Sequence, residues 1–264
     1  MKYSFSSNLL NITFEFPLRI ACRHMLKHWW KALTVLILTY VLVAGLISPV
    51  PKLPILHEAI RNTFFHPPLW IAMMVMLLIS TIFSIRYLKN GRLDDDLIAV
   101  ELAKTALLFG ILGCITGSVW AYFAWGDLWP NDPKTNGVAV GMLLYLAYFV
   151  LRSSFDDDLR RARISSVYSI FAFAAFIPLI LILPRLTDSL HPGNGGNPGF
   201  NQYDAHNSIK RIIRPAFIGF TLLGFWITQL RVRLRRLETR LDEQDELTKT
   251  DNNSTVLKSS TNQS

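Results

Sequence analysis

Two histidines and a run of tryptophans are the residues of this chain whose types and positions could do chemistry. His66 directly precedes an apolar segment, and His191 follows another one. Trp120, Trp125 and Trp129 lie in the stretch GCITGSVWAYFAWGDLWPND, at the end of a third apolar segment. Neutral imidazoles are ligands for transition metals, and indole rings are large flat surfaces on which a planar ligand can stack.

The tryptophans alone allow two interpretations. Aromatic side chains at a membrane surface commonly form an interfacial belt, and they can equally form a platform for a flat ligand. The histidines favour the platform, because two neutral imidazoles facing each other across aromatic rings are what axial ligation of haem iron requires. Haem also carries two propionates, for which Arg61, Lys134 and Arg185 are candidate cations.

Other site chemistries have weaker support. A zinc site requires three or four close ligands, and neither the histidines nor the two cysteines have such a spacing. Ser189 lies two residues before His191, but sequence proximity does not give the geometry of a Ser-His-Asp triad. His57 and His206 share the connections that hold His66 and His191, and they receive no role. We therefore expect no catalytic residues and a protein that is not an enzyme.

The elements that would position these residues are membrane-spanning helices. The chain has 264 residues, 51% of them hydrophobic, and a mean hydropathy of +0.29. Its net charge of +8 comes from Lys and Arg clustered beside apolar segments, which is typical of topology determinants rather than of nucleic-acid binding. In lipid a backbone must satisfy its own hydrogen bonds, and the apolar segments lack the alternation of barrel strands. The predicted fold class is all-α, a polytopic membrane helix bundle.

Six apolar segments are candidates for spans. They cover residues 32–47, 69–88, 105–123, 138–151, 167–183 and 217–230. The fourth is short, but it reaches about 27 Å if the helix begins at Lys134. Pro215 is well placed as the first helical residue of the sixth.

The orientation follows from the basic residues, because cytoplasmic segments retain positive charge. The amino-terminal segment, two alternate connections and the tail together hold 20 of the 27 Lys and Arg residues. Both termini are therefore predicted to be cytoplasmic, and the Trp129 loop faces outward. We divide the chain into a cytoplasmic amphipathic segment that lies on the membrane lipid (1–31), a six-helix domain (32–230) and a cytoplasmic helical extension with a disordered tail (231–264).

Two further patterns lie on the predicted cytoplasmic side. Aspartate triplets at 94–96 and 156–158 stand among arginines, and we interpret them as solvated loop acids and helix caps rather than metal sites. A leucine stripe follows the sixth span and favours a helix that extends into the cytoplasm and meets a partner helix. The stripe consists of Leu230, Leu234, Leu237 and Leu241. The polar composition from Thr248 onward predicts disorder.

The stretch GCITGSVWAYFAWGDLWPNDPKTN, followed by MLLYLAYFVLR, resembles the tryptophan-rich WWD signature of the haem-handling proteins of cytochrome c biogenesis, of the short six-helix CcmC (haem exporter C) type. That family places an arginine five residues before a histidine-proline, and Arg61 and His66 in IRNTFFHPP match this pattern. Its second histidine, after the fifth helix, would be His191. The resemblance covers about residues 49–230. Leu128 and Asn131 replace tryptophans of the signature, and Lys134 stands where the family usually has arginine.

The resemblance implies a membrane protein of cytochrome c maturation that holds haem b at the outer face of the bacterial inner membrane. His66 and His191 would be the axial ligands of the iron. The remaining haem-binding residues would be Trp120, Trp125, Trp129, Asp132, Arg61 and Lys134. The implied partners are a periplasmic haem chaperone that receives the haem, a small helper membrane subunit and an ABC-type ATPase and permease complex.

The main alternative is a small-solute transporter or permease subunit without bound haem. Such a protein would be expected to have broken helices and polar residues in mid-membrane, whereas the spans here are nearly free of charge away from their ends. A membrane enzyme, the third reading, would need a catalytic set in the outer loops, and only DSLH and scattered acids are available there.

Overall fold

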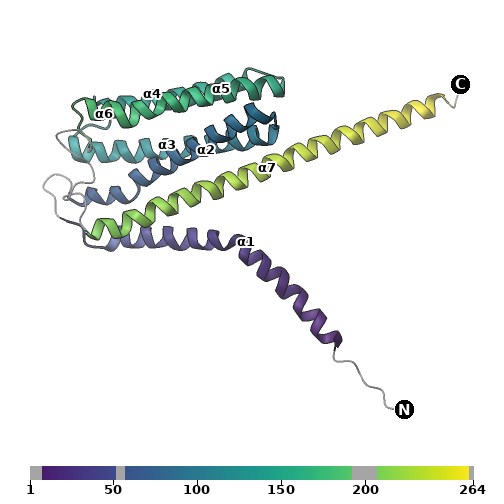
Figure 1. Ribbon diagram of the computed structural model, residues 1–264, viewed down its shortest axis with the longest axis horizontal. Coiled ribbons are helices and arrows are strands. Elements are labelled where there is room, and N and C mark those ends of the chain that lie inside the picture. Colours follow the sequence, from purple (N-terminus) through teal and green to yellow (C-terminus); the bar gives the residue numbers. More distant parts are fainter. Residues whose placement is uncertain (1–7, 52–56, 192–206, 262–264) are drawn as a thin grey trace, which may run out of the picture.

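All the described elements of the computed structural model are helices, and no strand occurs within residues 8–51, 57–191 and 207–261, the part of the chain that the structure describes (Figure 1). The α-helices are α1 (Asn8–Ile47), α2 (His66–Asn90), α3 (Leu93–Trp125), α4 (Pro133–Ser153), α5 (Asp158–Ile177), α6 (Leu183–Leu186) and α7 (Asn207–Thr261). A 3-10 helix, η1 (His57–Phe64), precedes α2, and a π-helical turn, η2 (Pro178–Ile182), joins α5 to α6.

Six of these helical stretches are long and apolar enough to cross a membrane, which confirms the predicted number of spans. They are His28–Ile47, Glu58–Asn90, Leu93–Trp125, Pro133–Ser153, Asp158–Leu186 and Asn207–Lys249. The fourth includes Lys134, as its length required. The chain is therefore a multi-pass membrane protein with an all-α fold.

The helices form layers around α2. In Figure 1, α4 and α5 lie along one side, α2 and α3 in the middle, and α7 and α1 along the other side. The main core cluster lies between α2, α3, α4 and α5, with buried Met73, Met76, Phe109, Tyr145 and Phe176. A second cluster packs α1 against η1 and the start of α7. At one end of the bundle, which we call the site end, α2, α4 and α7 begin and α3 and α6 finish.

The sixth span differs from the prediction at its start, because α7 begins at Asn207 and contains Pro215 in its interior. A proline has no backbone N–H, so the carbonyl of Arg211, four residues earlier, loses its helical partner. The hydroxyl of Tyr40 donates to this carbonyl at 3.4 Å. Ile209 and Ile212, which precede Pro215, are buried against η1 and α1. This packing stabilises the helical turns before the proline.

The end of α7 also differs from the expectation of disorder after Thr248, because the helix continues to Thr261. The sequence after Leu230 is rich in Leu, Arg and Glu, which have high helix propensity. An ion pair between Arg235 and Glu238, one turn apart, joins Nη1 to Oε2 at 2.9 Å. Leu234, Leu237 and Leu241 of the predicted stripe are more than half exposed.

The opposite end of the bundle is held by the first aspartate triplet. Asp96 forms a two-pronged ion pair with Arg152 of α4, with Nη1–Oδ1 and Nη2–Oδ2 distances of 2.8 and 2.5 Å. Asp95 pairs with Arg86 of α2 at 3.2 Å. Asp95 is 3% exposed and Asp96 is 5% exposed, so the interpretation of these two residues as solvated acids was wrong. In the second triplet, Asp157 caps α5 by accepting from the backbone N–H of Arg160.

This pairing predicts a large effect of removing one partner. Asp96→Ala should lower the free energy of unfolding by about 3–5 kcal/mol, because the guanidinium of Arg152 would stay buried without its carboxylate. Asp158→Ala, the matched control, removes an exposed acid paired with Arg161 and should change stability by less than about 1 kcal/mol. Denaturant titration of the detergent-purified variants measures both values. Equal losses in the two variants would contradict the buried pairing.

Candidate functional site

His66 opens α2 at the site end and packs against the side of α3. Pro67 and Pro68 follow it in the first turn of α2, where a missing backbone N–H leaves no helical hydrogen bond unmade. The imidazole fits because position 117 is glycine. A Cβ atom on Gly117 would lie only 2.6 Å from Cε1 of His66.

The hydrogen bonds of His66 fix its tautomer. Its Nδ1 lies 3.1 Å from the carbonyl oxygen of Gly113 and 3.2 Å from the hydroxyl oxygen of Thr116. A carbonyl oxygen can only accept, so Nδ1 carries the proton and donates it. The other nitrogen, Nε2, then holds a lone pair, and no hydrogen bond to it occurs among the described residues.

His191 is held in a similar way by Asp132. Its Nδ1 lies 2.8 Å from Oδ1 of Asp132, and a carboxylate likewise only accepts. Asp132 is the N-cap of α4, where Oδ1 also accepts from the backbone N–H of Lys134 at 2.9 Å. Its second oxygen, Oδ2, accepts from the backbone N–H of Leu190 at 2.6 Å. One buried carboxylate therefore joins the start of α4 to the segment that carries His191.

The charges around this contact keep the imidazole neutral. Burial by itself raises the pKa of Asp132, but hydrogen bonds from the backbone of Leu190 and the hydroxyl of Ser189, together with His191, hold this pKa below its ordinary value. Burial, followed by the positive charge of Lys134, lowers the pKa of His191 below its ordinary value, and Asp132 opposes this only in part. At pH 7 the ring is therefore neutral, with its lone pair on Nε2.

The predicted tryptophans connect the two histidines along α3. The ring centroids of Trp120 and His66 are 5.8 Å apart, and those of Trp125 and His191 are 4.9 Å apart. Five residues of α-helix separate the two tryptophans, which corresponds to a rise of about 7.5 Å. Trp125 is 38% exposed, and Trp129, beyond the left-handed Gly126 that ends α3, is 42% exposed. The structure thus brings His66, His191 and the tryptophans to the same end of α3.

The predicted cations Arg61 and Lys134 differ from each other in their contacts. Arg61 donates from Nε to Glu58 and from Nη1 to the carbonyls of Gly45 and Ser48, at 2.7, 2.8 and 2.9 Å, so it ties η1 to the end of α1. Lys134 is half-buried in the first turn of α4, and its side chain makes no hydrogen bond among the described residues. His206 lies outside the described residues.

The sequence analysis did not identify several residues that contact His66. Gly113 and Gly117, one turn apart on α3, allow the rings of Trp70 and His66 to lie against the helix, and Thr116 binds the imidazole. Trp70 packs edge to face with His66, with the ring centroids 6.2 Å apart. The usable signal was the spacing of small residues, G-x-x-x-G, which permits close approach in membrane helices.

The sequence comparisons agree with this arrangement. A family model described as CcmC, Heme exporter protein C, matches residues 15–248. The chain belongs to this family. Heme exporter protein C of Bradyrhizobium diazoefficiens is 28% identical over 197 residues, which cover 74% of this chain and 73% of that protein. The Escherichia coli K12 protein of the same name is 24% identical over 138 residues, 52% of this chain and 54% of that protein.

A second group of cytochrome c biogenesis proteins matches a shorter region. Cytochrome c biogenesis protein CcsA of Prochlorococcus marinus is 32% identical over 97 residues, which cover 35% of this chain and 29% of that protein. The resemblance inferred from the WWD stretch and the two histidines is therefore confirmed at the level of the CcmC family.

Within the described residues, no group of three or more His, Cys, Asp or Glu side chains could hold a metal ion by itself.

Asp132 caps α4 and also holds His191, and a second N-cap, Asp157, allows these two roles to be separated. Asp157→Ala should lower the free energy of unfolding by about 1 kcal/mol, because it removes a cap. Asp132→Ala should lower it further, because it also leaves the backbone N–H of Leu190 without its acceptor. Only Asp132→Ala should also release His191, which would speed its modification by diethyl pyrocarbonate. Asp132→Asn retains a capping oxygen and should give an intermediate rate. Peptide mass spectrometry measures the labelling, and an unchanged rate in Asp132→Ala would contradict the contact.

Proposed function

We propose that this protein binds haem b at the site end of the bundle and presents it for cytochrome c maturation. The observation that carries the proposal is the matched state of His66 and His191. Each ring donates from Nδ1 to a fixed acceptor and leaves Nε2 without a hydrogen-bond partner among the described residues. A metal-ligating histidine has this form, because the second hydrogen bond orients the ring and raises its basicity.

The residues around the histidines fit a large planar ligand. Haem iron accepts two axial nitrogen ligands, and its porphyrin has an apolar face that can stack on indole rings. Trp125 and Trp129 expose about two-fifths of their surface here. The Nε1 atom of Trp120 is buried beside His66 and has no hydrogen-bond partner among the described residues, so it is a donor that a polar ligand atom could satisfy.

The proposed roles of the charged residues follow from their contacts. Lys134 lies beside His191 with its ammonium group unbound among the described residues, so it can hold a haem propionate. Arg61 supports the site through η1, and its Nη2 donors, which make no hydrogen bond among the described residues, could bind a second propionate. Asp132 acts through His191, as a positioning residue rather than a direct haem contact.

The proposed setting is the bacterial inner membrane, with both termini in the cytoplasm and the site end facing the periplasm. The distribution of Lys and Arg supports this orientation. We propose that haem passes from the site to a periplasmic haem chaperone, and that a small helper subunit and an ABC-type ATPase and permease complex assist its release. The names of the relatives, heme exporter and cytochrome c biogenesis proteins, support this role. The exposed leucines of α7 would face a cytoplasmic partner.

Removing either histidine tests the proposal. His66→Ala and His191→Ala should each abolish most of the Soret absorbance of the detergent-purified protein, because a single axial nitrogen holds the iron weakly and one face of the site is lost. His28→Ala, which changes a histidine at the end of the first membrane span opposite to the site end, serves as the control. Full haem content in both site variants would contradict the assignment of His66 and His191 as ligands of the haem iron. Substrate-dependent transport in proteoliposomes by haem-free protein would instead favour a solute transporter.

Gly117 gives a test that leaves both ligands in place. In Gly117→Ala the new methyl group would meet Cε1 of His66 at 2.6 Å and push the imidazole from α3. We expect haem affinity to fall about 10- to 100-fold, as for losses of ligand orientation elsewhere. Gly224→Ala adds the same group in the core, where the nearest atoms are Cε2 of Phe109 at 3.1 Å and Sδ of Met76 at 3.2 Å, and should leave haem affinity unchanged because neither residue contacts His66. Haem titration followed by absorbance measures both, and equal affinities would contradict the packing of His66.

A further inference from the structure

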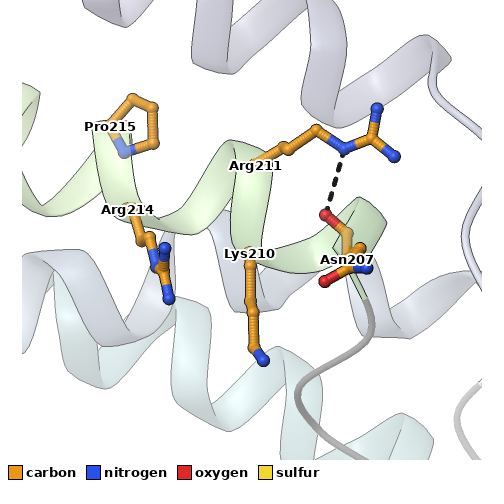
Figure 2. Close-up of a pocket in the computed structure, with 5 residues that line it drawn as sticks. All are labelled: Asn207, Lys210, Arg211, Arg214 and Pro215. Carbon is orange, nitrogen blue, oxygen red and sulfur yellow. Dashed lines mark hydrogen bonds between the residues drawn. The ribbon is translucent and has the colours of Figure 1, made fainter.

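Three basic residues occupy one turn near the start of α7. Lys210, Arg211 and Arg214 line a hollow of about 510 Å³ together with Asn207 and Pro215 (Figure 2). In Figure 2, Lys210 and Arg214 extend to one side of the helix and Arg211 to the other, where its Nε donates to the carbonyl of Asn207 at 3.2 Å. Lys210 and Arg214 therefore form a cationic pair on one side of the helix, and Arg211 adds a third positive charge at the same turn.

These charges have no carboxylate partner in the part of the chain that the structure describes. None of the ion pairs there includes Lys210, Arg211 or Arg214. They belong to the seven Lys and Arg residues that lie outside the predicted cytoplasmic segments, on the side where positive charge is disfavoured in membrane proteins. Like charges this close repel one another, so an anion between them would relieve the repulsion.

The position of the turn indicates the source of the anion. One face of α7, with Ile209 and Ile212, is buried against η1 and α1. Arg211 and Arg214 are exposed and Lys210 is partly exposed, and Ile218, one turn deeper than Arg214, is 56% exposed. In a bilayer this exposed stripe would face acyl chains, so the cations at its end lie at the level of the lipid head groups.

An apolar groove adjoins the same turn. Tyr40, Val43, Ile47 and neighbouring residues of α1 line a groove of about 490 Å³. The hydroxyl of Tyr40 donates to the carbonyl of Arg211, which joins the groove to the basic turn. A ligand that suits both parts has an anionic head and long apolar chains.

We propose that this surface binds the phosphate group of an anionic phospholipid of the outer leaflet, with an acyl chain in the groove on α1. This surface is distinct from the proposed haem site, because within the described residues α7 contributes no hydrogen bond or ring contact to His66, His191, Trp120 or Trp125. An acidic protein segment would also satisfy the cations, but it would leave the apolar groove unused. The proposal does not depend on haem binding.

Binding of phosphatidylglycerol to the full-length protein in detergent tests the proposal. Native mass spectrometry and thermal shift follow lipid retention, with phosphatidylcholine as the zwitterionic reference. The variant Lys210→Gln, Arg211→Gln, Arg214→Gln should bind phosphatidylglycerol roughly 100-fold more weakly, given the usual contribution of each basic residue near a membrane surface. The variant Arg233→Gln, Arg240→Gln, Lys249→Gln removes the same charge from exposed positions further along α7 and should bind as the native protein does.

The outcomes separate the possible ligands. Unchanged phosphatidylglycerol binding by the first triple variant would overturn the proposal. Equal protection by inorganic phosphate, or by a polyglutamate peptide, would also overturn it, because a free anion or an acidic protein segment would then be sufficient. If the triple variant loses the native elution volume or helical circular dichroism, the single variants Lys210→Gln and Arg214→Gln replace it. Each should then bind about fivefold more weakly.

Discussion

The carboxylate of Asp132 connects two parts of the chain that lie 58 residues apart, the start of α4 and the segment with Leu190 and His191. With 1% of its surface exposed, this carboxylate has little contact with water, and its oxygens are satisfied by backbone N–H groups and by the imidazole. Its removal would leave these buried donors without partners, which is more destabilising than the loss of the bonds alone. The direction of His191 therefore depends on the folding of α4.

His66 depends on α3 in the same way. Its acceptor is the carbonyl of Gly113, so both histidines are oriented by the continuous unit formed by α3, the turn after Gly126, Asp132 and α4. At the opposite end, Asp96 and Arg152 join α3 to α4, and Arg236 of α7 pairs with Asp94. These ion pairs fix the end of α3 that lies far from the site. The helix that carries Trp120 and Trp125 is therefore held at both of its ends.

The sequence allowed the six spans to be predicted, because hydropathy is a local property, and it identified the histidines and tryptophans that the structure brings to the same end of α3. The role of Asp96 could not be predicted, since its burial depends on Arg152, 56 residues away. The early start of α7 depends on a contact between Tyr40 and Arg211 that only the packed helices provide. The bonds of Arg61 to the end of α1 could not be predicted either, because they follow from the path of η1.

The most direct test of the paired histidines is the electron paramagnetic resonance spectrum of the ferric haem-loaded protein. Two neutral imidazoles bound to one iron through Nε2 impose a strong ligand field. We therefore expect a low-spin ferric signal as the main species, without a substantial high-spin component. A predominantly high-spin signal from the native, fully loaded protein would show that His66 and His191 do not both bind the iron, and it would contradict the proposed site.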